Sequence, residues 1–163
     1  MIRSAWFPTT ARAGLAVVWL IAGTAKVGDL SASGRTVNAY RILPSEAAMA
    51  FGAVLPFIEL ALGVLLLLGL GTRLVAGISA VLLIGFLTGI AWVWAHGYRI
   101  DCGCFSGGGD LAADERPTYL LDLLRDGSFL LLAGFLAARP TGRLAIDNWL
   151  RAAPVATDRT GFS

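Results

Sequence analysis

The chain has 163 residues, of which 56% are hydrophobic and 15% are charged, against roughly 45–50% and about 25% in soluble domains. Its mean hydropathy is +0.72 and its charges gather between long apolar runs, so the composition predicts an integral membrane protein and excludes an ordinary soluble domain. A formal net charge of +2 is too small and too dispersed for a surface that binds nucleic acid.

Four apolar segments are long enough to cross a hydrocarbon core of about 30 Å, which needs roughly 20 helical residues. They run from Ala11 to Val27, from Ala47 to Leu70, from Leu74 to Ala95 and from Tyr119 to Ala138. We predict an all-α fold, a membrane four-helix bundle at 11–138. It lies between a cytoplasmic N-terminal segment at 1–10 and a partly disordered tail at 139–163.

Two of these segments leave alternatives open. The basic start of the chain, followed by Ala13–Ala25, also resembles a secretory signal. We favour a retained span, because Lys26 follows at once and cleavage would leave an odd number of spans. The fourth segment is the least apolar, since three charged residues occupy its first turns: Asp122, Arg125 and Asp126.

Two patterns predict how the helices pack. Between the first two spans, three apolar residues recur at helical spacing and predict a short surface helix in 30–46 on the outer rim of the bundle: Val37, Tyr40 and Leu43. In the third span, four residues lie four positions apart and include one GxxxG motif, which predicts a close approach of another helix: Gly77, Val81, Gly85 and Gly89.

Basic residues in short loops predict the orientation. One side of the bundle would hold Arg3, Arg12, Arg73, Arg139, Arg143 and Arg151, and the other Lys26, Arg35, Arg41, Arg99 and Arg116. The slight excess predicts cytoplasmic termini and an external loop at about 96–118 in the cell membrane.

That loop contains both cysteines of the chain, Cys102 and Cys104, which flank Gly103. A disulfide between residues two apart needs a tight, strained backbone, which glycine permits. Strain makes a disulfide more oxidising, which suits a bond that is passed on during exchange. We therefore predict that the two cysteines are catalytic.

Two other interpretations of the cysteines remain. The two thiolates could bind zinc together with His96 and Asp101 or Asp110, although zinc modules usually supply more cysteine or histidine. They could also be inert thiols, although inert cysteines are usually buried and not placed in a polar loop. We predict no metal site.

Ionisable residues within the spans are the remaining candidates, because a charge in the membrane needs a partner. Glu59 lies near mid-membrane, and Lys26 or Arg125 could pair with it. The pair would fix helix register, or it would form a proton or quinone-headgroup site coupled to the cysteines. Arg125 shares a helical face with Asp122 and Asp126, and a guanidinium near a cysteine would lower the pKa of the thiol.

An ordered set of motifs over about residues 11–138 carries a family resemblance. The set comprises Gly23–Lys26, Tyr40–Pro44, Pro56–Leu60 with Gly63, Gly69 with Thr72–Arg73, Cys102–Phe105, and Arg125–Asp126. It resembles the MauE/DoxX family of redox-associated membrane proteins, and most of all the methylamine utilisation (MauE) family. One departure is Ser106, where the family's phenylalanine is typically followed by glycine.

The resemblance implies four membrane helices and a thiol–disulfide pathway with a thioredoxin-like partner, serving maturation of a redox protein of the methylamine dehydrogenase type. We take this as the leading hypothesis, with Cys102 and Cys104 as the exchanging pair and Glu59, Lys26, Arg125 and Asp126 as supporting polar residues. The alternatives are a quinone-linked oxidoreductase subunit, since DoxX-like proteins are associated with quinone reduction, and a non-catalytic scaffold. The direction of electron flow and the oligomeric state stay open.

Overall fold

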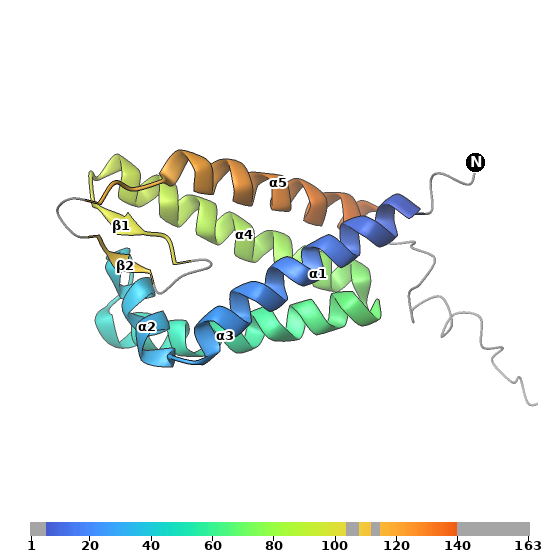
Figure 1. The fold of residues 1–163 in the computed structure, drawn as a ribbon, viewed down its shortest axis with the longest axis horizontal. Helices are drawn as coiled ribbons and strands as arrows, with labels where there is room; N and C mark the ends of the chain where they lie inside the picture. Colours follow the sequence, from blue (N-terminus) through green and yellow to red (C-terminus); the bar gives the residue numbers. More distant parts are fainter. Residues whose placement is uncertain (1–5, 104–107, 112–114, 140–163) are drawn as a thin grey trace, which may run out of the picture.

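A computed structural model describes residues 6–103, 108–111 and 115–139. This part of the chain is mostly helical, as predicted. The elements in order are α1 (Trp6–Val27), α2 (Leu30–Ala39), α3 (Ser45–Leu68), α4 (Thr72–Ala95), β1 (Ile100–Asp101), β2 (Gly109–Asp110) and α5 (Tyr119–Ala138). Figure 1 shows the four long helices side by side, with α2 and the strands at one end and the start of α1 at the other.

Local signals set the ends of the helices. The Asp29 side chain accepts a hydrogen bond from the backbone N–H of Ala32 at 2.8 Å and so caps the start of α2. Pro44 precedes α3, where its missing N–H costs nothing. Gly69 (φ 70°) and Gly71 (φ 57°) take left-handed conformations between α3 and α4, which lets the chain reverse direction within a few residues.

Three helices are long and apolar enough to cross a membrane: α1, α3 and α4. The first begins at Trp6, five residues before the predicted start. The helix α5 has the bounds predicted for the fourth span, but its three charged residues keep it out of this group, so a fourth span stays a prediction. The division of the chain at residues 10 and 138 is likewise untested, and the predicted tail disorder falls at 140–163, outside the described residues.

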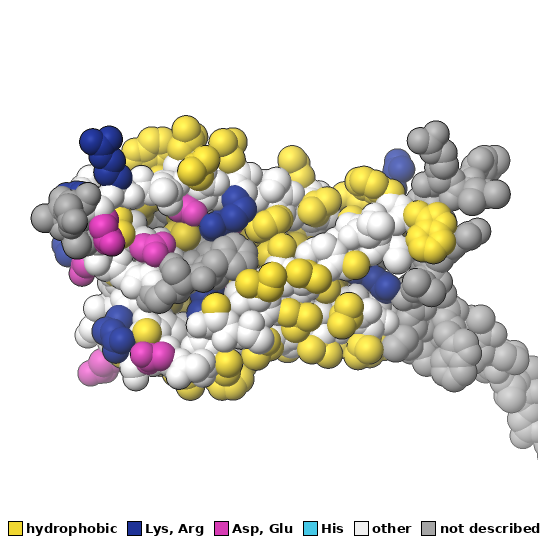
Figure 2. Space-filling view, in the orientation of Figure 1, with side chains coloured by type: hydrophobic (Ala, Val, Ile, Leu, Met, Phe, Trp, Pro, Cys, Tyr) yellow, Lys and Arg dark blue, Asp and Glu magenta, His cyan; other side chains and the backbone are white. Residues whose placement is uncertain are grey.

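The bundle is built from two helix pairs, α1 with α3 and α4 with α5. A core of buried apolar side chains joins them, formed by Ala11, Leu15, Ala16, Trp19, Leu62, Leu66, Val75, Ala76, Leu83, Ala133 and Leu136. The indole N–H of Trp19 donates to the hydroxyl of Ser79 at 3.0 Å, which links α1 to α4. Figure 2 shows apolar side chains along the length of the bundle and charged ones gathered mainly at the end with α2 and the strands.

The short helix α2 lies within the segment where the sequence predicted a surface helix. It ends at Ala39 and buries its inner face at Ser33, Gly34, Thr36 and Ala39, with Gly34 against α3 and Thr36 against Gly103 and Gly108. At the crossing point, a Cβ on Gly52 would lie 2.6 Å from the Cα of Gly34. The two glycines allow the backbones to meet more closely than an apolar pattern alone would indicate. The opposite face of α2, with Ser31, Arg35 and Asn38, is exposed, so α2 is a surface helix as predicted.

Candidate functional site: a cysteine held against an arginine

The segment that leads to Cys102 is tied down at the end of the bundle. The strands β1 and β2 pair antiparallel, with Ile100 opposite Asp110. The hydroxyl of Tyr119, the first residue of α5, donates to the carbonyl of Tyr98 at 2.5 Å and accepts from the N–H of Ile100 at 2.9 Å. The two hydrogen bonds of this buried tyrosine fix β1 to the start of α5.

The residue that follows α2, Tyr40, holds Cys102 from the other side. The hydroxyl of Tyr40 donates to the carbonyl oxygen of Cys102 at 3.0 Å. The following Gly103 has φ 67°, and its N–H donates to Oδ1 of Asp101 at 3.2 Å. A Cβ at Gly103 would overlap the side chain of Thr36, so glycine is required here both for its backbone angle and for space.

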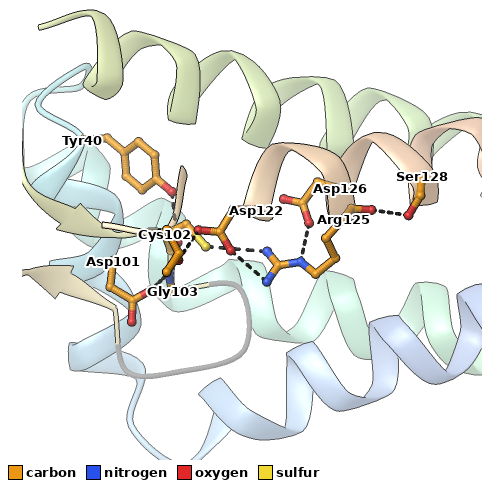
Figure 3. A network of polar contacts seen from close by, with 9 residues as sticks. Tyr40, Asp101, Cys102, Gly103, Asp122, Arg125, Asp126 and Ser128 are labelled. Carbon is orange, nitrogen blue, oxygen red and sulfur yellow. Dashed lines mark hydrogen bonds and ion pairs between the residues drawn. The ribbon is translucent and has the colours of Figure 1, made fainter. Parts of the chain in front are cut away.

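Arg125 places its guanidinium beside the sulfur of Cys102 (Figure 3). Its Nη2 lies 3.7 Å from Sγ, its Nη1 lies 3.0 Å from Oδ1 of Asp122, and its Nε donates to Oδ1 of Asp126 at 2.9 Å. The Arg125 side chain is 30% exposed and Cys102 is 8% exposed. The two carboxylates hold the guanidinium in place, and its remaining nitrogen faces the sulfur.

The second polar group of the bundle lies between α1 and α3. The Nζ of Lys26 is 2.6 Å from Oε1 of Glu59, which is fully buried. The other oxygen, Oε2, has no hydrogen-bond partner in the described part of the chain. Of the two partners that the sequence offered to Glu59, the structure selects Lys26, because Arg125 is engaged at the cysteine end.

A cavity of about 300 Å³ lies between these two groups. Lys26 and Asp29 line it, as do Cys102 and Gly103, and most of the remaining wall is apolar side chain from α2, α3 and α4. The sequence did not indicate this cavity, since an opening between helices depends on which faces fail to meet.

The glycine stripe of α4 lies partly on this cavity. Gly85 lines it, and among the described residues nothing lies within 4 Å of a Cβ built at Gly77 or Gly85. The predicted close approach of a helix is therefore wrong at these two positions. At Gly89 the close neighbour is the ring of Tyr40, 3.1 Å from such a Cβ, so the small residue makes room for the side chain that holds Cys102.

Some site predictions fall outside the described residues, namely those on Cys104 and Ser106. Among the residues that are described, no group of three histidine, cysteine, aspartate or glutamate side chains could hold a metal. Nδ1 of His96 lies 2.8 Å from the carbonyl of Trp92, and the ring packs beside Trp92 and Tyr98. Tyr119 and Thr36 are site residues that the sequence did not single out, since neither is charged nor part of a motif.

The apolar helices and the cysteine site define a membrane protein with a thiol centre at one end of its bundle. The family model described as methylamine utilisation protein MauE matches residues 4–139, so the chain belongs to the MauE family. No curated protein and no solved structure matches the chain significantly.

Proposed function

We propose that this protein carries out thiol–disulfide exchange at the cell membrane, with Cys102 and Cys104 as the exchanging pair and a thioredoxin-like protein as the partner. The exchange serves the maturation of another redox protein, by family resemblance in a pathway of the methylamine dehydrogenase type. The observation that carries the proposal is the guanidinium of Arg125 lying 3.7 Å from the sulfur of Cys102.

This contact matters because the thiolate, and not the thiol, is the nucleophile in exchange. A fixed positive charge beside the sulfur favours the thiolate. Asp122 and Asp126 together carry one formal charge more than Arg125, so what favours the thiolate is the N–H of Nη2, which the two carboxylates hold toward Cys102. Asp126 is thus a positioning residue in this proposal, and Lys26 and Glu59 fix α1 to α3.

The proposal includes a four-span topology with α5 as the fourth span. A helix of 20 residues is about 30 Å long at roughly 1.5 Å per residue, which matches the hydrocarbon core. The charged residues of α5 face the cysteine segment and not the lipid, as expected of ionisable groups in a span. The termini would be cytoplasmic and the cysteines external.

The direct test traps the exchange intermediate. In membranes that contain the full-length protein, Cys102→Ser and Cys104→Ser should each abolish disulfide transfer to a thioredoxin-like dithiol probe while leaving membrane insertion intact. One of the two single variants should accumulate a mixed disulfide with the probe, detectable on a non-reducing gel. Transfer at the wild-type rate in both variants would contradict the proposal and favour a scaffold that only anchors a partner.

A further inference from the structure

The cavity of about 300 Å³ opens toward the lipid-facing surface of the bundle. Apolar lining residues of α4 and α3 are exposed, with Val81 at 68% and Phe51 at 43%. Exposed apolar side chains on a membrane helix bundle face hydrocarbon, so a ligand would enter from the membrane and not from water. This entrance selects a lipophilic ligand.

The wall offers hydrogen-bond donors without a net charge. Lys26 has three N–H groups, of which Glu59 accepts one, and the carboxylate cancels the lysine's charge at 2.6 Å. Asp29, which also lines the cavity, lies 3.7 Å from Nη2 of Arg35. An anionic lipid headgroup would therefore find no uncompensated cation at this wall, whereas a neutral molecule with a carbonyl oxygen would find a donor.

Cys102 adds a redox group to the same wall. Although only 8% of Cys102 is exposed, it lines a space that admits a small molecule. An exchange pair that has been reduced by its partner must pass on two electrons and two protons before it can act again. A lipophilic carbonyl compound that takes up two electrons and two protons is a quinone.

We propose that this cavity binds the ring of a membrane quinone, which reoxidises the Cys102–Cys104 pair; this inference rests on the proposed function. The two thiols lose two electrons and two protons and form one disulfide. The quinone gains them at its two carbonyl oxygens and leaves as quinol. Electrons thus flow from the thioredoxin-like partner through the cysteines into the membrane, and Lys26 binds one quinone oxygen.

A pair of glycines on α4 allows a matched test. Gly85 lines the cavity, whereas Gly77 lies two turns earlier on the same helix and does not, and neither has a neighbour within 4 Å among the described residues. Gly85→Leu should fill the cavity, and Gly77→Leu makes the same chemical change elsewhere. The protein, purified in lipid nanodiscs and reduced beforehand, is mixed anaerobically with decylubiquinone, and quinol formation is followed by ultraviolet absorbance.

We expect quinol formation by the wild type and by Gly77→Leu, at least a tenfold slower rate in Gly85→Leu, and none in Cys102→Ser. Disulfide transfer to a thioredoxin-like probe, measured on the same samples after chemical oxidation, should be equal in both leucine variants. Equal quinol formation in the two leucine variants would overturn the cavity assignment.

Two further outcomes separate this inference from the proposed function. Disulfide transfer without any quinol formation by the wild type would overturn the quinone and leave the exchange role standing. Quinol formation without transfer to the probe would overturn the exchange role, and with it the flow of electrons from the partner to the quinone. Photolabelling by an azidoquinone should modify α3 or α4 residues of the cavity, and excess decylubiquinone should reduce this labelling. If it did not, the cavity would have no specific site for a quinone, and the inference would be overturned.

Discussion

At the residue scale, the reactivity of Cys102 depends on what surrounds its sulfur and its carbonyl. The guanidinium of Arg125 faces the sulfur, and the hydroxyl of Tyr40 holds the carbonyl oxygen. The first contact acts on the chemistry of the thiol and the second on its position. The two effects can be separated, because loss of the charge and loosening of the segment change the alkylation rate of the cysteine in opposite directions.

Removing the charge of Arg125 should slow alkylation. In a Cys104→Ser background, Arg125→Gln is expected to reduce the rate of Cys102 alkylation by iodoacetamide at neutral pH roughly tenfold, because a charge-assisted hydrogen bond contributes about 1.5–3 kcal/mol and less at long distance. Arg116→Gln, at an exposed position outside the network, is the control for net charge. An unchanged rate in Arg125→Gln would mean that the guanidinium does not stabilise the thiolate.

Loosening the cysteine segment should have the opposite effect. Tyr119→Phe removes a hydroxyl that serves the carbonyl of Tyr98 and the N–H of Ile100, and unsatisfied buried groups cost about 1–3 kcal/mol each. We expect alkylation of Cys102 to be about tenfold faster, because the segment opens more often. Tyr98→Phe leaves both bonds in place and should match the wild type; equal rates in the two variants would show that the hydroxyl does not anchor β1.

At the element scale, a buried ion pair and close glycine contacts hold the first half of the bundle together. Lys26 of α1 and Glu59 of α3 form a contact that is shielded from water. Breaking such a pair on one side generally costs about 3–5 kcal/mol, whereas replacing both partners with apolar residues is often nearly neutral. The pair therefore determines how α1 and α3 fit together more than how stable they are.

A double-mutant cycle measures this coupling. Lys26→Met and Glu59→Leu should each lower the free energy of unfolding in detergent by about 3–5 kcal/mol, and the double variant should recover most of the loss. Unfolding is followed by circular dichroism against denaturing detergent. Additive losses in the double variant would show that the two charges are stabilised independently of each other.

The crossing of α2 over α3 gives a second test at this scale. Gly52→Ala is expected to destabilise the protein by about 1–3 kcal/mol, because its Cβ would lie 2.6 Å from the Cα of Gly34 and the backbones must separate. Gly77→Ala, which meets no neighbour within 4 Å in the described structure, should be neutral or stabilising. If thermal unfolding ranked the two variants in the reverse order, the close crossing would be wrong.

At the scale of the whole molecule, the polar and apolar parts are separated along the long axis. The charged side chains collect mainly around α2, the strands and the start of α5, and apolar side chains surround the rest (Figure 2). This distribution and the family place the protein in a membrane. The thiol site then lies at one end of the bundle, where exchange with a partner outside the lipid is geometrically feasible.

The topology can be measured with single cysteines. In a variant with both native cysteines replaced by serine, Thr118→Cys and Ala138→Cys lie at the two ends of α5. With a membrane-impermeant maleimide on intact cells, we expect labelling of Thr118→Cys without permeabilisation and of Ala138→Cys only after it. Labelling of both from one side would exclude α5 as a span, and the reverse pattern would invert the orientation.

Much of this architecture was predictable from local patterns. The long apolar runs indicated the helices and the membrane, because a backbone in hydrocarbon must satisfy its own hydrogen bonds. The spacing of Asp122, Arg125 and Asp126 placed three charges on one helical face. The buried face of α2, the strand pair and the role of Tyr119 were not predictable, since each depends on partners distant in the chain.

The sequence by itself determined that the protein is a helical membrane protein of the MauE family, and it predicted two cysteines near ionisable residues as the reactive groups. Only the tertiary structure decided that Glu59 pairs with Lys26, that Arg125 faces Cys102, and that a cavity joins Lys26 to Cys102. Helix periodicity shows which residues share a face, but which faces meet, and where they leave a space, depends on packing among all the helices at once.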